Sequence, residues 1–187
     1  MLNISDISEI KNQKSTMDKT AWYNLQDLDT LDTPALVWYP SRIAQNIETL
    51  VTMLPEVNRL RPHIKTHKTA EGIRMMQEQG IYKFKCATIA EAELLAINNA
   101  KDILLAHQPV GMKIDRLIKL IQTYPATQFS TIADDVQQAE RINAKFNEAG
   151  ITLNIFIDLN VGMNRTGIVP DAAAIELYEY IQSATHL

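Results

Sequence analysis

Residues 84–107 read FKCATIAEAELLAINNAKDILLAH, and this stretch decides the fold class. A short apolar run at residues 84–88 is followed by a helical segment and by a second apolar run at residues 103–107. Thr88 and Glu91 have the spacing of a capping box, so a helix is expected to begin where the first strand ends. Strand, helix and strand in this order are typical of a parallel βαβ unit.

The same alternation extends in both directions from this unit. Further strands are expected at residues 35–39, 59–66, 128–132 and 153–159, with helices between them. Ser41 is the expected N-cap of the first helix, and Asp134 with Gln137 forms a looser capping box further along the chain. The repeated units fit an open doubly wound sheet or a closed (β/α)8 TIM-type barrel. Because no G-x-G-x-x-G follows the first strand, we favour the barrel.

Composition limits the classes of function. The chain has 187 residues, 46% of them hydrophobic, and a net charge of −4, so it is expected to fold without the excess positive charge that binds nucleic acid. No stretch is apolar enough to cross a membrane, and the single cysteine, Cys86, is expected in the core. These features predict a cytoplasmic protein. A complete barrel typically needs about 250 residues, so the barrel is expected to be incomplete in this chain.

A basic segment carries the chemistry, and it reads RLRPHIKTHK from Arg59 to Lys68. As a strand it would direct its charged residues to one face, with Lys65 and His67 near the top of a barrel cavity. A lysine in such a partly desolvated pocket has its ammonium form disfavoured, which frees the amine to attack an aldehyde. An anionic ligand such as a phosphorylated cofactor would neutralise the pocket.

The local pattern leaves other interpretations open. An exposed edge strand with solvated charges, or a patch that binds phosphate or nucleic acid, would give a similar segment. His63 and His67 are four residues apart, as in a metal pair on a helix, but the glutamate of H-E-x-x-H is missing. No metal site is therefore assigned to these residues.

Three motifs in order resemble a known group of enzymes. They are DTPAL at 32–36, RPHIKTHK at 61–68 and GMNRTG at 162–167. Together they resemble the D-threonine aldolase and D-serine dehydratase family, within the alanine racemase-like (fold type III) pyridoxal 5′-phosphate (PLP) enzymes. The resemblance implies that Lys65 binds PLP as a Schiff base and that Arg165 contacts its phenolic oxygen. His67, which a strand would place beside Lys65 near the top of the cavity, is also expected to contact the cofactor.

The resemblance also implies an activity and a domain plan. The expected activity is retro-aldol cleavage of a D-3-hydroxy amino acid to glycine and an aldehyde. The alternatives are a D-serine dehydratase-like lyase, an amino-acid racemase, or a noncatalytic PLP-binding protein. Residues 1–30 would be a polar extension, 31–40 a strand of a C-terminal β domain, and 41–187 part of the barrel. A homodimer is expected. Any divalent metal would be bound by residues beyond this chain, and the chain by itself would be inactive.

Overall fold

The computed structural model describes residues 21–25 and 28–187. Of the polar extension predicted at residues 1–30, residues 1–20 and 26–27 lie outside this range. The chain divides into two compact units, Met1–Arg42 and Ile43–Leu187. In the first unit, the Trp22 ring packs edge-on against Tyr39 at 5.1 Å, and Arg42 stacks over it at 4.6 Å. Residues 31–39 form no strand, so the strand predicted at 35–39 is wrong for this structure. Its assignment to a second domain stays a prediction.

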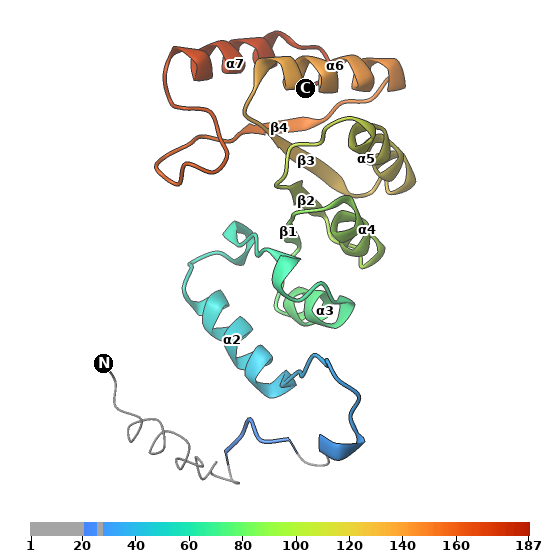
Figure 1. Cartoon of the computed structure of the whole chain (residues 1–187), viewed down its shortest axis with the longest axis vertical. Coiled ribbons are helices and arrows are strands. Elements are labelled where there is room, and N and C mark those ends of the chain that lie inside the picture. Colours follow the sequence, from blue (N-terminus) through green and yellow to red (C-terminus); the bar gives the residue numbers. More distant parts are fainter. Residues whose placement is uncertain (1–20, 26–27) are drawn as a thin grey trace, which may run out of the picture. The chain divides into compact units, whose positions relative to one another are not determined.

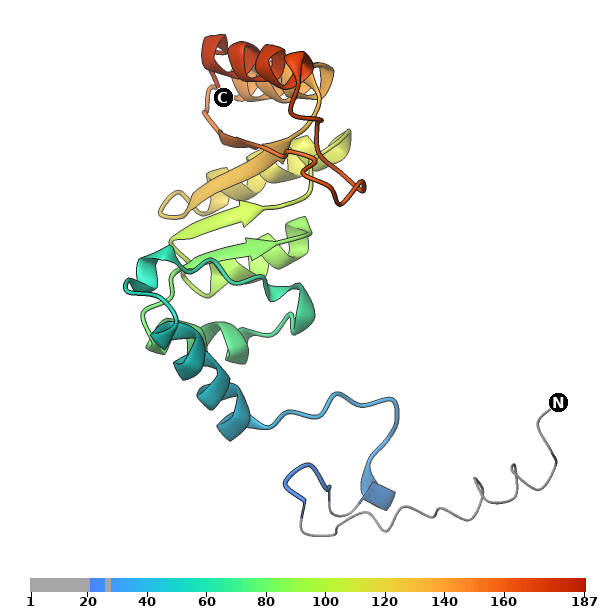
Figure 2. The same ribbon diagram turned by 90° about the vertical axis from the view of Figure 1, so that its left-hand side faces the viewer.

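The second unit is built around a parallel sheet of four strands in sequential order. They are β1 (Lys83–Cys86), β2 (Asp102–Leu105), β3 (Gln128–Ala133) and β4 (Asn154–Ile157), each hydrogen-bonded to the next. Each crossover contains a helix, as Figures 1 and 2 show. A doubly wound sheet reverses its strand order at a switch point, whereas a barrel adds its strands in one direction. The sequential order therefore confirms the prediction of a barrel-type sheet, here open.

Helices cover one face of this sheet. α4 packs against β1 and β2, α6 packs against β3, and α7 packs against β4. The helix bounds are α2 (Pro40–Thr52), α3 (Ala70–Glu78), α4 (Ile89–Ile97), α5 (Met112–Thr123), α6 (Val136–Ala149) and α7 (Ala172–Ser183). Short 3-10 helices lie at η1 (Leu28–Thr30), η2 (Val57–Arg59) and η3 (Ile64–Thr66).

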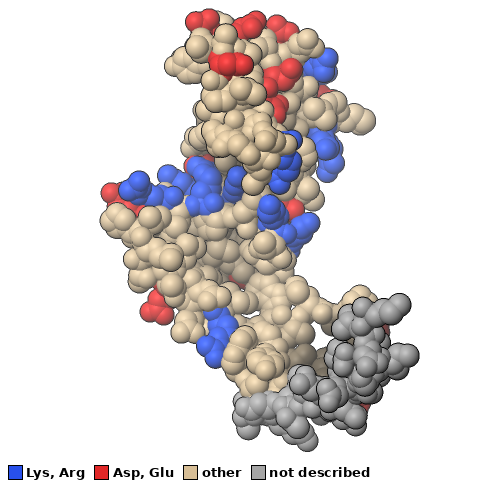
Figure 3. All heavy atoms as spheres, turned by 60° about the vertical axis from the view of Figure 1, so that its left-hand side comes forward, with Lys and Arg blue, Asp and Glu red and all other residues tan. Residues whose placement is uncertain are grey.

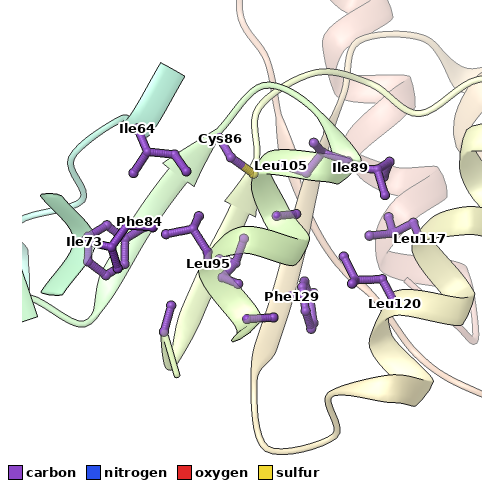
Figure 4. Packing of buried hydrophobic residues seen from close by; sticks show 14 of the residues in the cluster. Ile64, Ile73, Phe84, Cys86, Ile89, Leu95, Leu105, Leu117, Leu120 and Phe129 are labelled. Atoms are coloured by element: carbon purple, nitrogen blue, oxygen red, sulfur yellow. The ribbon is translucent and has the colours of Figure 1, made fainter. Parts of the chain in front are cut away.

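The main core lies between the sheet and these helices (Figure 4). Alternate residues of β1 and β2, such as Phe84 and Ile103, are fully buried on the helix side, while their neighbours on the other face are partly exposed. Cys86 belongs to this core, as predicted: it is fully buried, and burial raises the pKa of its thiol to about 12. The sheet therefore has one dry face and one open face.

Two predicted helix starts are displaced, by two residues at α2 and by one residue at α6. α2 begins at Pro40, so Ser41 lies inside the helix rather than at its N-cap. Proline suits a first helical position because its missing N–H is not needed there. α6 is capped by Asp135, whose carboxylate accepts a hydrogen bond from the Gln138 amide at 2.7 Å. Asp134 therefore does not cap α6. The N-cap predicted at Thr88 is confirmed, with the Glu91 amide donating to the Thr88 hydroxyl at 3.1 Å. The reciprocal bond of a capping box is shifted by one residue, because the Glu91 carboxylate accepts from the Ala87 amide.

Candidate active site

Lys65 lies in a 3-10 turn, not on a strand. The strand predicted at residues 59–66 is wrong: this segment pairs with the sheet through one isolated bridge between His63 and Lys85, and η3 begins at the next residue. The Lys85 amide donates to the Pro62 carbonyl at 2.8 Å. Because proline has no N–H, this position can accept but cannot donate in a ladder. The His63 ring then accepts from the Lys65 amide at 3.2 Å and caps the turn.

The turn places Lys65 at the carboxyl end of β1 with its side chain exposed. The partly desolvated pocket expected around this lysine is not formed by the described residues. A barrel needs more strands than four to close around an interior, so the face of the sheet opposite the helices stays open here. The predicted role of Lys65 does not depend on a strand, because the turn still carries it to the edge where barrel active sites lie.

Two of the basic residues are neutralised by carboxylates of the chain itself. Arg61 makes a two-pronged ion pair with Asp102, with both nitrogen–oxygen distances at 2.6 Å. Lys68 lies 3.3 Å from the carboxylate of Glu91, which is 4% exposed and also accepts from the Ala87 amide at 2.8 Å. The expectation that an anionic ligand neutralises the whole basic face is therefore wrong for Arg61.

No such pairing occurs at Lys65. Among the ion pairs of the described residues, none includes Lys65. Its backbone is fixed by the His63 ring, and the next turn is fixed by the ion pair of Lys68. The amine of Lys65 is thus exposed on a constrained turn, while the amine of Lys68 forms an ion pair with the buried carboxylate of Glu91.

Both histidines of the segment favour the neutral form. Burial, followed by the nearby ammonium groups of Lys65 and Lys85, lowers the pKa of His63, and the Glu91 carboxylate opposes this shift. Burial lowers the pKa of His67 below its ordinary value of 6.5. The His67 Nδ1 accepts from the Thr69 amide at 3.2 Å, so the neutral ring carries its proton on Nε2.

Arg165 lies on the loop that follows β4, and its side chain is exposed. The base of this loop is closed by two backbone hydrogen bonds of 2.8 Å, from the Ile168 amide to Asp158 and from the Asn160 amide to Ile168. Inside the loop, the Asn160 side chain accepts from the Asn164 amide at 3.0 Å. The loop is therefore an ordered structure and presents Arg165 at the carboxyl edge of the sheet.

Lys65 and Arg165 both lie where the strands have their carboxyl ends. They are at opposite ends of the strand order, however. The turn of Lys65 adjoins β1, and the loop of Arg165 follows β4, which is four strand positions from the His63 segment. At about 4.8 Å for each step, a flat sheet would separate these two positions by roughly 19 Å. Curvature of the sheet is therefore what would let both side chains reach one ligand.

Charge is unevenly distributed over the surface. Figure 3 shows lysine and arginine side chains in a band at the level of β1, with acidic side chains concentrated toward the end that carries α6 and α7. In the described part of the chain, no three His, Cys, Asp or Glu side chains gather in a way that could hold a metal ion. No helix within residues 21–25 and 28–187 is long and apolar enough to span a bilayer.

Two of the residues present fit an aldehyde cofactor that also carries an anionic oxygen. An amine without a carboxylate partner can condense with an aldehyde, and a guanidinium keeps its charge and its donors at any ordinary pH. Lys65 and Arg165 supply these two groups at the carboxyl edge. Sequence reasoning missed Glu91 and Asp134 as site residues because it assigned both to helix capping. Their contacts with Lys68 and Gly167 join residues from different elements, and local spacing gives no signal of them.

The open sequential sheet, its helix-covered face and its basic carboxyl edge define a partial α/β barrel of the type that binds ligands at the strand ends. Residues 40–187 match the alanine racemase N-terminal domain family, and the chain belongs to it. It is 28% identical over 165 residues to the 3-hydroxy-D-aspartate aldolase of Paracoccus denitrificans, a match that covers 86% of this chain and 42% of the relative. It is 31% identical over 150 residues to the D-threo-3-hydroxyaspartate dehydratase of a Delftia species, covering 79% of this chain and 39% of the relative.

Solved structures agree with this assignment. The D-threonine aldolase of Filomicrobium marinum superposes with a TM-score of 0.76 at 27% identity, covering 86% of this chain and 43% of that protein. An alanine racemase of Clostridium difficile, at 16% identity and a TM-score of 0.62, shares the fold. The chain spans about two fifths of the length of these relatives. The family predicted from the three motifs is confirmed.

Proposed function

We propose that this chain is part of a PLP-dependent lyase that cleaves a D-3-hydroxy amino acid to glycine and an aldehyde, with Lys65 as the residue that binds the cofactor. Family membership supports the fold, and the names of the similar aldolases support the reaction class. The observation that carries the assignment of Lys65 is the contrast between two neighbouring amines: Lys68 is paired with buried Glu91, and Lys65 has no such partner among the described residues.

PLP, when bound, supplies an electron sink for the bond that is broken at the substrate α-carbon. Lys65 would hold it covalently through its amine, and the His63 ring would fix the turn that carries this amine. Arg165 would donate hydrogen bonds to the phenolic oxygen of the cofactor from the loop after β4. His67 would lie beside the cofactor as a neutral ring that carries its proton on Nε2, because burial lowers its pKa and its Nδ1 accepts from the Thr69 amide.

A dehydratase is the second candidate. The relative named a D-threo-3-hydroxyaspartate dehydratase is as similar to this chain as the aldolases are. The strand predicted at 35–39 as part of a second, C-terminal β domain is not formed, so it does not help to distinguish a two-domain enzyme from a noncatalytic PLP-binding protein. The preference for a lyase over a noncatalytic PLP-binding protein, or over a racemase, therefore rests on the names of the similar proteins. A homodimer in the cytoplasm that binds neither nucleic acid nor membrane belongs to the same proposal. The net charge of −4 supports the part of it that concerns nucleic acid.

The test of the cofactor lysine uses the complete protein. Reduction with borohydride should bleach the visible absorption of lysine-bound PLP and fix the label to one peptide. We expect the label on Lys65, loss of the absorption in Lys65→Ala, and retention of the absorption in Lys68→Ala. A label on Lys68, or no visible absorption in the wild-type protein, would contradict the proposal.

The reaction is tested by product analysis. D-Threonine, D-serine and a D-3-hydroxyaspartate should be assayed with and without a divalent metal. Glycine together with an aldehyde supports the aldolase. A keto acid together with ammonia identifies the dehydratase instead, and the L-enantiomer as product identifies a racemase.

A further inference from the structure

The loop that carries Arg165 is held by a residue of a different strand. Among the described residues, a single hydrogen bond joins residues 160–167 to another loop: the Gly167 amide donates to the Asp134 carboxylate at 3.0 Å. Asp134 directly follows β3 and is half-buried. Hydrogen bonds to a charged acceptor are about twice as strong as neutral ones, so this contact is a substantial tether for a loop with an otherwise exposed tip.

Asp134 is itself fixed in place from the other side. Its backbone amide donates to the side chain of Gln108, on the loop after β2, at 2.9 Å. Gln108, Asp134 and Gly167 therefore link the three successive loops at the carboxyl ends of β2, β3 and β4. A displacement of Asp134 would be transmitted to the Arg165 loop, because the tethered amide lies only two residues from Arg165.

The remaining hydrogen bonds of residues 160–167 are internal. The Asn160 side chain bonds to Gly162 and Asn164 within the loop, and the base is closed against residues 158–168 of the same segment. These contacts preserve the shape of the loop. Its base is also attached to β3, because the Asp158 amide donates to the Ala133 carbonyl at 2.9 Å. The bond from the Gly167 amide to Asp134 adds a second tether, two residues from Arg165.

We propose that Asp134 is a positioning residue that holds the Arg165 loop over the carboxyl edge of the sheet and thereby sets the affinity for the cofactor. The inference rests on the proposed function, since it takes Arg165 as a cofactor contact. Asp134 does not touch the reacting atoms; it acts through the Gly167 amide. Its loss should weaken cofactor binding in the same direction as loss of Arg165, but by less.

The test compares Asp134→Ala, Asp134→Asn and Asp135→Ala in the complete protein. Asp135 is the adjacent residue and caps α6, so its replacement controls for general destabilisation of this region without touching the loop. Trypsin cleavage after Arg165 reports the freedom of the loop without any cofactor. Titration of the cofactor-free protein with PLP, followed by visible absorption, reports the affinity.

We expect Asp134→Ala to speed cleavage after Arg165 and to raise the PLP dissociation constant, each about tenfold, which is the size of one lost hydrogen bond to a charged group. Asp134→Asn keeps an oxygen acceptor, so its rate of cleavage after Arg165 and its PLP dissociation constant should stay close to those of the wild type. Asp135→Ala should lower thermal stability and leave both properties near wild type.

The inference is overturned if Asp134→Ala leaves the cleavage rate unchanged, or if it speeds cleavage while PLP affinity stays the same. It is also overturned if Asp135→Ala has an equal effect on both. Failure of the proposed function is distinct: in that case the wild-type protein does not acquire the visible absorption with PLP, or Arg165→Ala binds PLP as well as wild type, whatever the protease finds at the loop.

Discussion

Replacing Gly167 by alanine tests the geometry of the Arg165 loop most directly. Gly167 has a φ of +96°, and a Cβ built there would lie 2.6 Å from the Asn160 nitrogen, 2.7 Å from the Leu159 carbonyl carbon and 3.1 Å from the Asp158 oxygen. All three are backbone atoms and cannot rotate away. The positive φ alone costs a side-chain-bearing residue about 1–2 kcal/mol.

The clash adds to this cost, because it is relieved only when residues 167–168 move away from residues 158–160 at the loop base. The hydrogen bonds from Asn160 to Ile168 and from Ile168 to Asp158 are both 2.8 Å, and each is worth about 1 kcal/mol net. The sum is roughly 3–4 kcal/mol, which corresponds to an increase of more than a hundredfold in the open population of the loop. Because the loop is exposed, the strain should be released by local opening rather than by global unfolding.

Hydrogen exchange of the Asn160 and Ile168 amides in the complete protein measures this opening. The matched control is Gly162→Ala on the same loop: Gly162 has a φ of +118°, but a Cβ at this position would meet nothing within 4 Å, so only the backbone cost applies. We expect exchange in Gly167→Ala to exceed that in Gly162→Ala by about thirtyfold, which corresponds to the roughly 2 kcal/mol assigned to the clash. Equal exchange in the two variants would refute the described packing at the loop base.

Three further predictions concern the sheet and its edge. Thr88→Ala should lower the free energy of unfolding by about 1 kcal/mol in chemical denaturation because α4 loses its N-cap, whereas Ser41→Ala, inside α2, should change it by less than about 0.5 kcal/mol. Burial lowers the pKa of His67, so as the pH falls the unfolded chain takes up this proton before the folded chain does, and thermal stability should fall as the pH drops below 6.5. His67→Gln should make the melting temperature depend less on pH in this range. The same pH dependence in the variant and the wild type would contradict the prediction. Cys86, with its pKa raised to about 12 and no exposed surface, should resist thiol reagents at pH 8 in the native protein and react fully in denaturant; labelling of the native protein would show that β1 is open.

Much of the fold was predictable because it depends on local chemistry. The apolar runs that became β1 to β4 were located to within two residues at either end, and the N-cap at Thr88 was found from spacing alone. The segment around Lys65 was harder. Its charges alternate as on a strand, but Pro62 cannot donate to a ladder and the His63 ring stabilises a turn instead. A side-chain cap of this kind competes with strand pairing and leaves no trace in a hydrophobic pattern.

By itself, the sequence determined the βα alternation, the family, and the residues that the motifs single out, because periodicity, capping and motif order are properties of neighbouring residues. Only the tertiary structure decided between a barrel-type and a doubly wound sheet, since that choice depends on which strands pair. It also decided that Lys68 rather than Lys65 is paired with Glu91, and that Asp134 tethers the Arg165 loop. The physical reason is the same throughout: these contacts join residues far apart along the chain, and a parallel sheet brings them together only when its strand ends gather at one edge.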